Sequence, residues 1–300
     1  MIAQKEIRWG IIGGGNVVET KSGPAFNIPN KSCAYAVFRR EQEAAESTRQ
    51  KLGAEKAYSS LDEFLKNPLI DIVYIAIPPG LHFEYAMKCL SYKKAVYVEK
   101  PITTSYHDAI HLIEAFDQEN IPLFVAHYRR ALKRFIFIKN IISEEMGNIT
   151  QFHYQLFRKR SDDEHHPWLY IKELSGGGKF ADIGTHSLDM FQYLFGDIES
   201  VSSYLRHISA PNGTEDAVSL SLKFVNGIVG SANYNFLSLD KKDHLVVYGE
   251  DKTLEFSLHG NAPIILTTKS GKSVYDMPFP DCIEQDMIQQ IVDYLRDLPS

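Results

Sequence analysis

The sequence predicts an α/β fold, with an N-terminal Rossmann domain followed by an α+β domain that contains a large, mostly antiparallel sheet. From residue 7 to about residue 125, apolar runs alternate with amphipathic stretches, as expected of βαβ units in a parallel sheet. A glycine-rich loop directly follows the first apolar run. Beyond about residue 148 the period changes, and turn residues separate short strands. These three observations together indicate two domains.

The first half alternates predicted strands and helices. The strands are expected at residues 7–12, 34–38, 72–77, 95–98 and 123–126. The helices are expected at residues 41–52, 61–66, 82–90 and 105–119. Breaks are marked by Pro68, Pro78, Pro79 and Pro122. We therefore assign the Rossmann domain to residues 1–122.

The second half, residues 123–300, is expected to form the second domain. Asn226 and Gly227 lie between two apolar runs at 219–225 and 228–235, which predicts a β-hairpin. We expect a type I′ turn there, which requires positive φ at both central residues. Residues 282–298 form an amphipathic pattern, and this final helix is expected to close the chain, with the option of packing back on the first domain.

The composition limits the kinds of partner. The net charge of −6 argues against a large nucleic-acid interface, because phosphate binding needs clustered lysine and arginine side chains. A small-molecule partner is expected instead. No apolar run approaches ~18 residues, and the first residues lack a secretory signal pattern. With three cysteines at no metal-like spacing, the chain is expected to be cytoplasmic, with reduced thiols and no membrane contact.

The glycine-rich loop predicts a dinucleotide site. Gly13 and Gly15 occupy the first two positions of a G-x-G-x-x-G turn, and Val18 replaces the third glycine. The first glycine permits the tight turn, and the second lets backbone N–H groups approach a pyrophosphate. The expected cofactor-binding residues here are Gly13, Gly14, Gly15, Asn16 and Val17. The alternative is a tight turn with no ligand.

Two arginines follow the second predicted strand. An NAD-preferring site usually has an acidic residue there to bind the ribose 2′-hydroxyl, whereas this chain has Arg39 and Arg40. Adjacent guanidinium groups suit a 2′-phosphate, so NADP is favoured over NAD. Glu41 and Glu43 weaken this preference, because either arginine could pair with them on the helix surface.

The stretch Glu99-Lys100-Pro101 ends another predicted strand. Ligands of open parallel sheets bind at the carboxyl ends of the strands, so Lys100 is placed to reach a substrate. An ammonium shielded from water can hold a substrate hydroxyl and help to manage its proton. Pro101 stops the strand and fixes the loop. The alternative is a surface pair of Glu99 with Lys100.

A second polar motif lies in the second half. Asp182 and His186 are four residues apart in a predicted helix that follows three glycines, so their side chains share one face. The carboxylate can orient the imidazole and raise its basicity, which suits removal of a hydroxyl proton. A structural Asp–His hydrogen bond would explain the same pattern. Asp189 is expected to be an ordinary acid on the helix surface.

These motifs together resemble the Gfo/Idh/MocA family of NAD(P)-dependent oxidoreductases. The matching features are GIIGGG at residues 10–15, a P-x-x-x-H loop from Pro78 to His82, EKP at residues 99–101, and GGG with DIGTHSLD within residues 176–189. Their order and spacing cover almost the whole chain, and EKP with D-x-x-x-H is far more specific than the glycine loop. Val18 departs from the family pattern.

The resemblance implies roles for the residues and the domains. It implies that residues 123–300 bind the substrate and dimerise, so that the chain forms a homodimer or homotetramer through the second sheet. Lys100, Asp182 and His186 would be catalytic, and Pro78, His82, Glu99 and Lys100 would lie at the cofactor. Tyr128, Arg129 and Trp168 resemble residues near the substrate cleft, with a scaffold role as the equal alternative. The implied reaction interconverts an alcohol and a ketone on a sugar, inositol or related polyol.

Several alternatives stay open at this point. The chain could be a sensor or scaffold that binds a nicotinamide cofactor without catalysis, or it could act on an imine or cyclic amide. Either Lys100 or His186 could carry the proton. The acidic and histidine residues at 162–166 have no regular ligand spacing, so a solvated loop is expected there and no metal site is predicted.

Overall fold

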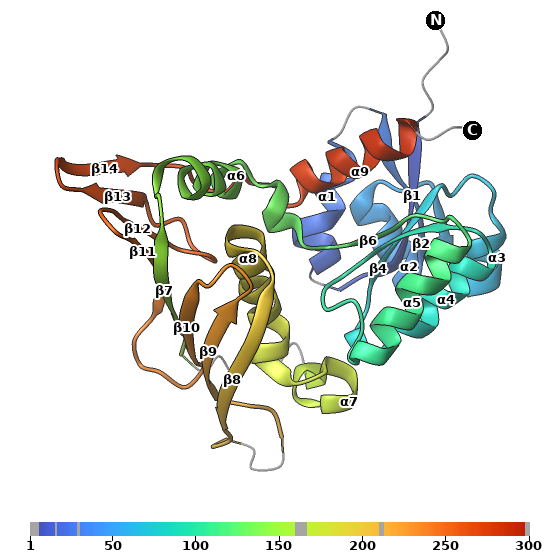
Figure 1. The fold of residues 1–300 in the computed structure, drawn as a ribbon. Coiled ribbons are helices and arrows are strands. Elements are labelled where there is room, and N and C mark those ends of the chain that lie inside the picture. The colour runs from blue at the N-terminus through green and yellow to red at the C-terminus, as the bar shows by residue number, and fades with distance from the viewer. Residues whose placement is uncertain (1–5, 16, 29–30, 160–166, 210–212, 298–300) are drawn as a thin grey trace, which may run out of the picture. The chain divides into compact units, whose positions relative to one another are not determined.

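The structure is a computed structural model that describes residues 6–15, 17–28, 31–159, 167–209 and 213–297. It divides into two compact units (Figure 1). Unit 1 comprises Met1–Ala131 and Pro280–Ser300, and unit 2 comprises Leu132–Phe279. Each unit has its own sheet, one parallel and one largely antiparallel, which confirms the predicted fold class.

Unit 1 contains a six-stranded parallel sheet in the order β3-β2-β1-β4-β5-β6. The strands are β1 (Ile7–Gly13), β2 (Ser32–Phe38), β3 (Lys56–Tyr58), β4 (Ile72–Ala76), β5 (Ala95–Val98) and β6 (Leu123–Val125). The central strands are buried on both faces, which explains their continuous apolar runs. β3 was not predicted from the sequence, because this short edge strand has no buried residue.

Helices cover both faces of this sheet (Figure 1). They are α1 (Gly23–Ala25), α2 (Gln42–Leu52), α3 (Leu61–Lys66), α4 (His82–Ser91), α5 (Tyr106–Gln118) and α9 (Gln285–Asp297). One core cluster joins the sheet to α1 and α9, and a second joins it to α3, α4 and α5. Trp9 and Phe64 are among the largest side chains buried in these clusters.

The boundary between the units lies later than the expected boundary at residue 122. Because β6 pairs in parallel with β5, residues 123–125 complete the first sheet instead of beginning the second domain. The final helix α9 also belongs to unit 1, where Ile288, Ile291 and Val292 enter the core. An apolar run identifies a strand, but only its pairing assigns that strand to a sheet.

Unit 2 contains an eight-stranded mixed sheet in the order β14-β13-β12-β11-β7-β10-β9-β8. The strands are β7 (Ile149–Phe157), β8 (Ile198–Arg206), β9 (Ala217–Phe224), β10 (Val229–Asn235), β11 (Lys242–Gly249), β12 (Thr253–Phe256), β13 (Ile264–Thr268) and β14 (Gly271–Tyr275). The pair β7 and β10 is parallel, and the other neighbouring strands are antiparallel.

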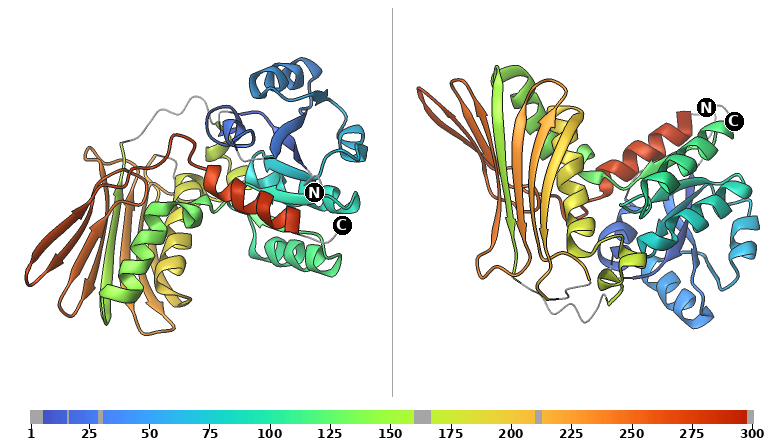
Figure 2. Two further views of the ribbon diagram at one scale, coloured as in Figure 1. Left: turned by 90° about the horizontal axis from the view of Figure 1, so that it is seen from above. Right: turned by 60° about the horizontal axis from the view of Figure 1, so that its bottom comes forward.

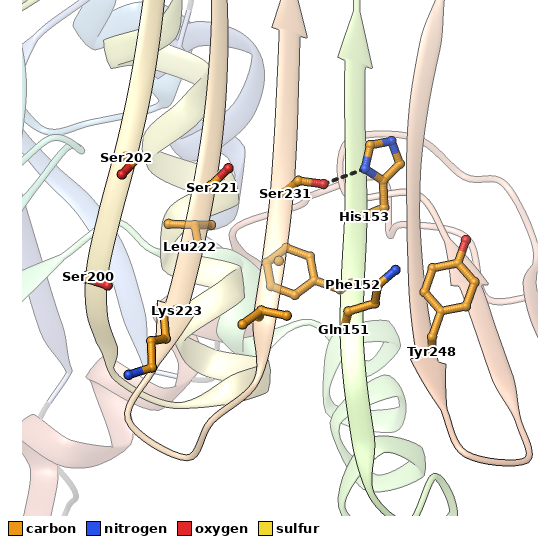
Figure 3. A pocket seen from close by; sticks show the side chains of 12 residues that line it. Gln151, Phe152, His153, Ser200, Ser202, Ser221, Leu222, Lys223, Ser231 and Tyr248 are labelled. Atoms are coloured by element: carbon orange, nitrogen blue, oxygen red, sulfur yellow. Dashed lines mark hydrogen bonds between the residues drawn. The ribbon is translucent and has the colours of Figure 1, made fainter.

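Two helices, α6 (Lys133–Asn140) and α8 (Thr185–Phe195), lie over one face of this sheet (Figure 2). Phe152 of β7 stacks on Phe195 of α8 with ring centroids 4.6 Å apart. Its neighbours in β7 point to the opposite face, because side chains alternate along a strand. That face carries a shallow pocket lined by polar side chains, including Gln151, His153 and Ser231 (Figure 3).

The predicted hairpin is present between β9 and β10, but its turn is not type I′. Only Gly227 of the two central residues has a positive φ, at 88°. The N–H of Gly227 donates to the carbonyl oxygen of Phe224, and the N–H of Phe224 donates to the carbonyl oxygen of Ile228. The loop is therefore longer by one residue, with glycine in the left-handed position that follows a β-turn.

Candidate functional site

The glycine loop after β1 has the geometry that a dinucleotide requires. Gly13 has φ of 119°, and a Cβ there would lie 2.3 Å from the carbonyl oxygen of Ala76. A Cβ on Gly15 would meet nothing within 4 Å, so the space beside this residue is open. A ligand can therefore approach the backbone at Gly15, as the pyrophosphate of a dinucleotide does. Val17 begins the following helical turn, and Asn16 lies outside the described residues.

Val18, which replaces the third glycine of the G-x-G-x-x-G motif, is accommodated by packing in the core. Val18 is fully buried in the core of unit 1. The close approach between helices occurs instead at Gly23, where a Cβ would lie 2.4 Å from the side chain of Leu52 in α2. The sequence analysis did not single out Gly23, because one glycine inside a helix has no distinctive pattern.

The two arginines after β2 occupy different environments. Nη1 of Arg39 lies 3.4 Å from the carbonyl oxygen of Gly14 and 3.2 Å from Oγ1 of Thr48, so its guanidinium is turned toward the glycine loop. Arg40 is exposed. Arg39 therefore ties β2 to the loop, and Arg40 presents its charge to solvent.

The EKP segment follows β5 at the carboxyl edge of the sheet. Oε1 of Glu99 accepts a 2.7 Å hydrogen bond from the hydroxyl of Tyr74, and Oε2 accepts the backbone N–H of Lys100 at 3.2 Å. Glu99 thus turns inward and is held by the core, unlike a surface pair. Burial raises its pKa, while the ammonium of Lys100 opposes that shift. Lys100 is partly buried, and its bond to Pro101 is cis.

His82 joins two loops of unit 1. It is completely buried, with Nε2 2.8 Å from the carbonyl oxygen of Ile77 and Nδ1 2.9 Å from that of Pro101. Burial lowers the pKa of this histidine. Pro78 immediately precedes the short helix Pro79–Leu81, which leads into α4. Both ring nitrogens of His82 are directed at the protein backbone, so this residue connects the loop after β4 to the EKP loop.

Asp182 and His186 lie where a π-helical turn, η6 (Phe180–Gly184), runs into α8. π-Helical turns are rare and often occur at functional sites. His186 is buried and Asp182 is partly buried. A Cβ on Gly184 would lie 2.5 Å from the ring of Phe180, so only glycine permits this turn. Asp189 is buried, which corrects its expected position on the helix surface.

The three glycines before this turn all have positive φ, from 79° to 151°. Oγ of Ser175 accepts the N–H groups of Gly177 and Gly178 at 3.3 and 3.1 Å. A Cβ on Gly178 would lie 2.3 Å from the Cβ of Thr214. The glycines are therefore required by the backbone and by contact with Thr214, and they set the start of the turn that carries Asp182.

The sequence analysis missed a neighbour of His186. The rings of His186 and His259 are 6.1 Å apart, and Nε2 of His259 lies 3.4 Å from Oγ of Ser187. Asp243 accepts the backbone N–H of His259, and it also accepts the hydroxyl of Tyr154 at 3.1 Å. His259 follows β12 in a loop whose local sequence carries no motif, so only the tertiary structure reveals this contact.

The three candidate substrate residues have mixed exposure. Tyr128 and Arg129 are both buried in unit 1, and the guanidinium carbon of Arg129 lies 5.3 Å from the centre of the Tyr128 ring. Trp168 is partly buried in a short helix of unit 2. The burial of Tyr128 and Arg129 favours a scaffold role for them, whereas Trp168 is only partly buried.

The described ranges contain neither a helix that could span a membrane nor a cluster of metal ligands. Among these residues, no helix is both long enough and apolar enough to cross a bilayer. No group of three or more histidine, cysteine, aspartate or glutamate side chains among them is arranged to hold a metal ion. The acidic and histidine residues at 162–166 lie outside the described ranges.

Family models match both units of the chain. The model described as "Oxidoreductase family, NAD-binding Rossmann fold" matches residues 7–127, and the "GFO/IDH/MocA C-terminal domain" matches residues 137–255. The two matches together span most of the sequence. Along the sequence, the two matched domains follow the same order as the motifs described above.

Individual relatives align along nearly the full chain. An oxidoreductase from Formosa agariphila is 34% identical and covers 97% of this chain and 91% of its own. A myo-inositol 2-dehydrogenase from Thermotoga maritima is 27% identical, with 98% and 89% covered. The solved structure of a levoglucosan dehydrogenase in complex with NADH and levoglucosan has a TM-score of 0.83 at 22% identity, with 97% and 89% covered. That structural likeness concerns the fold.

Proposed function

Because the chain belongs to the Gfo/Idh/MocA family of oxidoreductases, we propose that it transfers a hydride between a nicotinamide cofactor and a sugar, inositol or related polyol. The reacting group would be a secondary alcohol in one direction and the matching ketone in the other. Two relatives support this substrate class by their names, the myo-inositol 2-dehydrogenase and the levoglucosan dehydrogenase.

One observation carries the proposal. The open glycine loop after β1 and Lys100 after β5 both lie at the carboxyl edge of one parallel sheet. Ligands of such sheets bind at this edge. Gly13 and Gly15 fit a dinucleotide, because the first adopts the required left-handed φ and the second leaves space for the ligand. Lys100 is then a cation at this same edge of the sheet, on a loop held by Glu99 and His82.

Three side chains have separate roles in the proposed hydride transfer. When bound, the nicotinamide would accept or supply the hydride. The ammonium of Lys100 would hold the substrate oxygen and stabilise the negative charge that develops on it. His186 would take the hydroxyl proton during oxidation and return it during reduction, with Asp182 orienting the imidazole. The opposite assignment, with Lys100 as the proton carrier, uses the same groups.

We propose NADP as the preferred cofactor, with NAD as the alternative. The exposed guanidinium of Arg40 supports this preference, because it would offer a bidentate donor to a 2′-phosphate. Arg39 would contribute to cofactor binding through the glycine loop, since its guanidinium lies against Gly14. Arg40 is therefore the residue on which the discrimination between the two cofactors depends.

We further propose that the chain forms a homodimer or homotetramer through the sheet of unit 2. The sheet face shown in Figure 3 carries small and polar side chains, including Ser202, Ser221 and Ser231. On the edge strand β8, Tyr204 shares this face with Ser202 and is 82% exposed. A broad face of this kind can pair with a second copy with little steric hindrance.

We also propose a cytoplasmic location. Cys33, Cys89 and Cys282 are free thiols in the structure, as expected of a protein from a reducing compartment. Thiol alkylation of protein taken directly from cells, followed by mass measurement, would test this; alkylation only after reduction would contradict it.

The experiment that tests the activity has two stages. Purified protein is first titrated with NADPH and NADH, with nicotinamide fluorescence as the signal. A panel of inositols, aldoses, ketoses and anhydrosugars is then screened in both directions through the absorbance of the reduced nicotinamide. We expect turnover with at least one member of the panel. Tight cofactor binding with no turnover on any of them would favour a sensor.

A further inference from the structure

Two carboxyl groups, the partly buried Glu99 and the buried Glu284, interact at the EKP loop. Glu99 follows β5, and Glu284 immediately precedes α9, far away in the sequence. Glu284 is only 1% exposed. Burial raises the pKa of Glu99, and burial together with the charge of Glu99 raises the pKa of Glu284 well above its usual range. Two like charges in a buried site cannot both form without a large free-energy cost.

Two tyrosines connect these carboxyl groups. Tyr74 donates to Oε1 of Glu99 at 2.7 Å, and the hydroxyl of Tyr97 lies 3.5 Å from Oε2 of Glu284. The two rings stack with centroids 5.3 Å apart. Burial raises the pKa of both tyrosines, so they stay protonated and act as donors.

One oxygen of the pair lacks a donor. Within the described residues, Oε1 of Glu284 is buried and has no hydrogen-bond partner. An ionised carboxylate with an unsatisfied buried oxygen is costly, whereas a protonated carboxyl avoids most of that cost. The missing donor at Glu284 and the repulsion between two negative charges therefore both favour one bound proton on the pair of Glu99 and Glu284.

The pair is coupled to the proposed catalytic lysine. Oε2 of Glu99 accepts the backbone N–H of Lys100, and the ammonium of Lys100 acts on both carboxyl groups. The titratable and charged groups that face the pair or its tyrosines come from every neighbouring element: Lys21, Tyr74, Tyr97, Lys100 and Tyr128. Two cations, the exposed Lys21 and the partly buried Lys100, thus act on the two carboxyl groups.

We propose that Glu284 is a positioning residue for Lys100: together with Glu99 it retains one proton at neutral pH, so that the pair presents one negative charge to the lysine. One charge holds the ammonium near the end of β5 and leaves it able to contact a substrate oxygen. A second charge would draw the ammonium toward the pair and away from the substrate. The part of this inference that concerns Lys100 rests on the proposed function, whereas the retained proton does not.

Infrared spectroscopy tests the retained proton without any turnover. The C=O stretch of a protonated carboxyl is measured for the wild type and for Glu284→Gln at neutral pH. We expect a band in the wild type that is lost in Glu284→Gln. Glu215→Gln is the matched control, because Glu215 in unit 2 also has a pKa raised by burial. That variant should leave the Glu284-dependent band unchanged.

Each outcome of this measurement decides the proposal. A spectrum in which Glu284→Gln removes no protonated-carboxyl band overturns it, whether or not the enzyme turns over. If Glu284→Gln does not fold, Tyr97→Phe replaces it. Loss of the facing phenol should shift the same band, and an unshifted band would count against the pair.

The pH profile tests the effect on Lys100. In the wild type, loss of the shared proton at alkaline pH should lower kcat, whereas Glu284→Gln lacks this proton and should lose that limb. Neutral kcat and the cofactor Kd should stay within about threefold of the wild type in the control Asp286→Asn, whose pH profile should keep the alkaline limb. Superimposable profiles for wild type and Glu284→Gln would reject the positioning role. An inactive wild type would reject the proposed function and leave the infrared result standing on its own.

Discussion

His82 and Pro101 are joined through Nδ1 of the imidazole and the backbone carbonyl oxygen of the proline, 2.9 Å apart. The other ring nitrogen of His82 lies 2.8 Å from the carbonyl oxygen of Ile77. One buried side chain therefore lies between the loop after β4 and the loop that carries Lys100, and in its neutral form the ring donates to one of the two carbonyl oxygens. Because proline has no N–H, the backbone offers few other ways to hold this loop.

Replacing this link should destabilise unit 1 in a pH-dependent way. His82→Asn removes the buried ring and the one hydrogen bond that a neutral imidazole can donate to these carbonyl groups, so it should lower the free energy of unfolding by about 1–3 kcal/mol near neutral pH. Because burial lowers the pKa of His82, the unfolded chain binds a proton at higher pH than the folded protein. The contribution of His82 is therefore complete above about pH 6.5 and is lost as the pH falls below that value.

Urea unfolding between about pH 5 and pH 8 measures this effect. His82→Asn should show a flatter decline on the acid side than the wild type. His107→Asn is the control, because the side chain of His107 is 89% exposed on α5. Parallel curves for the wild type and His82→Asn would contradict a neutral, buried imidazole.

Lys100→Met should separate cofactor binding from chemistry. The methionine keeps the length of the side chain but removes the ammonium that would stabilise the substrate oxygen. We expect kcat to fall by about 10²–10⁴-fold, while the Kd for NADPH changes little. Lys93→Met is the control, since Lys93 forms an exposed ion pair with Glu119. Undiminished turnover in Lys100→Met would remove this lysine from the mechanism.

Alanine at the two loop glycines should have opposite effects. Gly15→Ala places its Cβ in open space, so stability should change by less than about 0.5 kcal/mol while NADPH binding weakens. Gly13→Ala should cost more than about 1 kcal/mol of stability, because its φ is left-handed and its Cβ would meet Ala76. Thermal unfolding and fluorescence titration measure both effects. Unchanged NADPH affinity in Gly15→Ala would argue against a dinucleotide at this loop.

Arg40→Ala should reduce the preference for NADP. Loss of a charge-assisted hydrogen bond to the 2′-phosphate should weaken NADPH binding by about 1.5–3 kcal/mol and leave NADH binding nearly unchanged. Lys56→Ala on β3 is the control, since its exposed ammonium lies 3.7 Å from Glu55. The ratio of the two dissociation constants is the measurement, and an unaltered ratio would assign the cofactor preference elsewhere.

A large charged side chain on the open sheet face should disrupt assembly. Ser221→Arg introduces a long cation into the face shown in Figure 3, so the molar mass in solution should fall to that of a monomer. Light scattering after size-exclusion chromatography measures the mass. Ser91→Arg, at the end of α4 in unit 1, should leave the mass unchanged. An assembly that survives Ser221→Arg would place the contact on another surface.

The sequence by itself determined the fold class, most of the strands of unit 1 and the motifs around Gly13, Lys100 and His186. These features are local, because apolar periodicity, glycine positions and proline breaks act over a few residues. The hairpin at Gly227 was also predictable, although its turn type depended on which of the two central residues adopted positive φ.

Only the tertiary structure decided the features that join distant segments. Strand pairing assigned β6 and α9 to unit 1. The ring of His82 is buried between two backbone carbonyl groups, and Asp189 is buried instead of lying on the helix surface. Glu284 meets Tyr97 across 187 residues, and His259 meets Ser187 across 72. Such contacts arise from the packing of whole elements, so no short stretch of sequence encodes them.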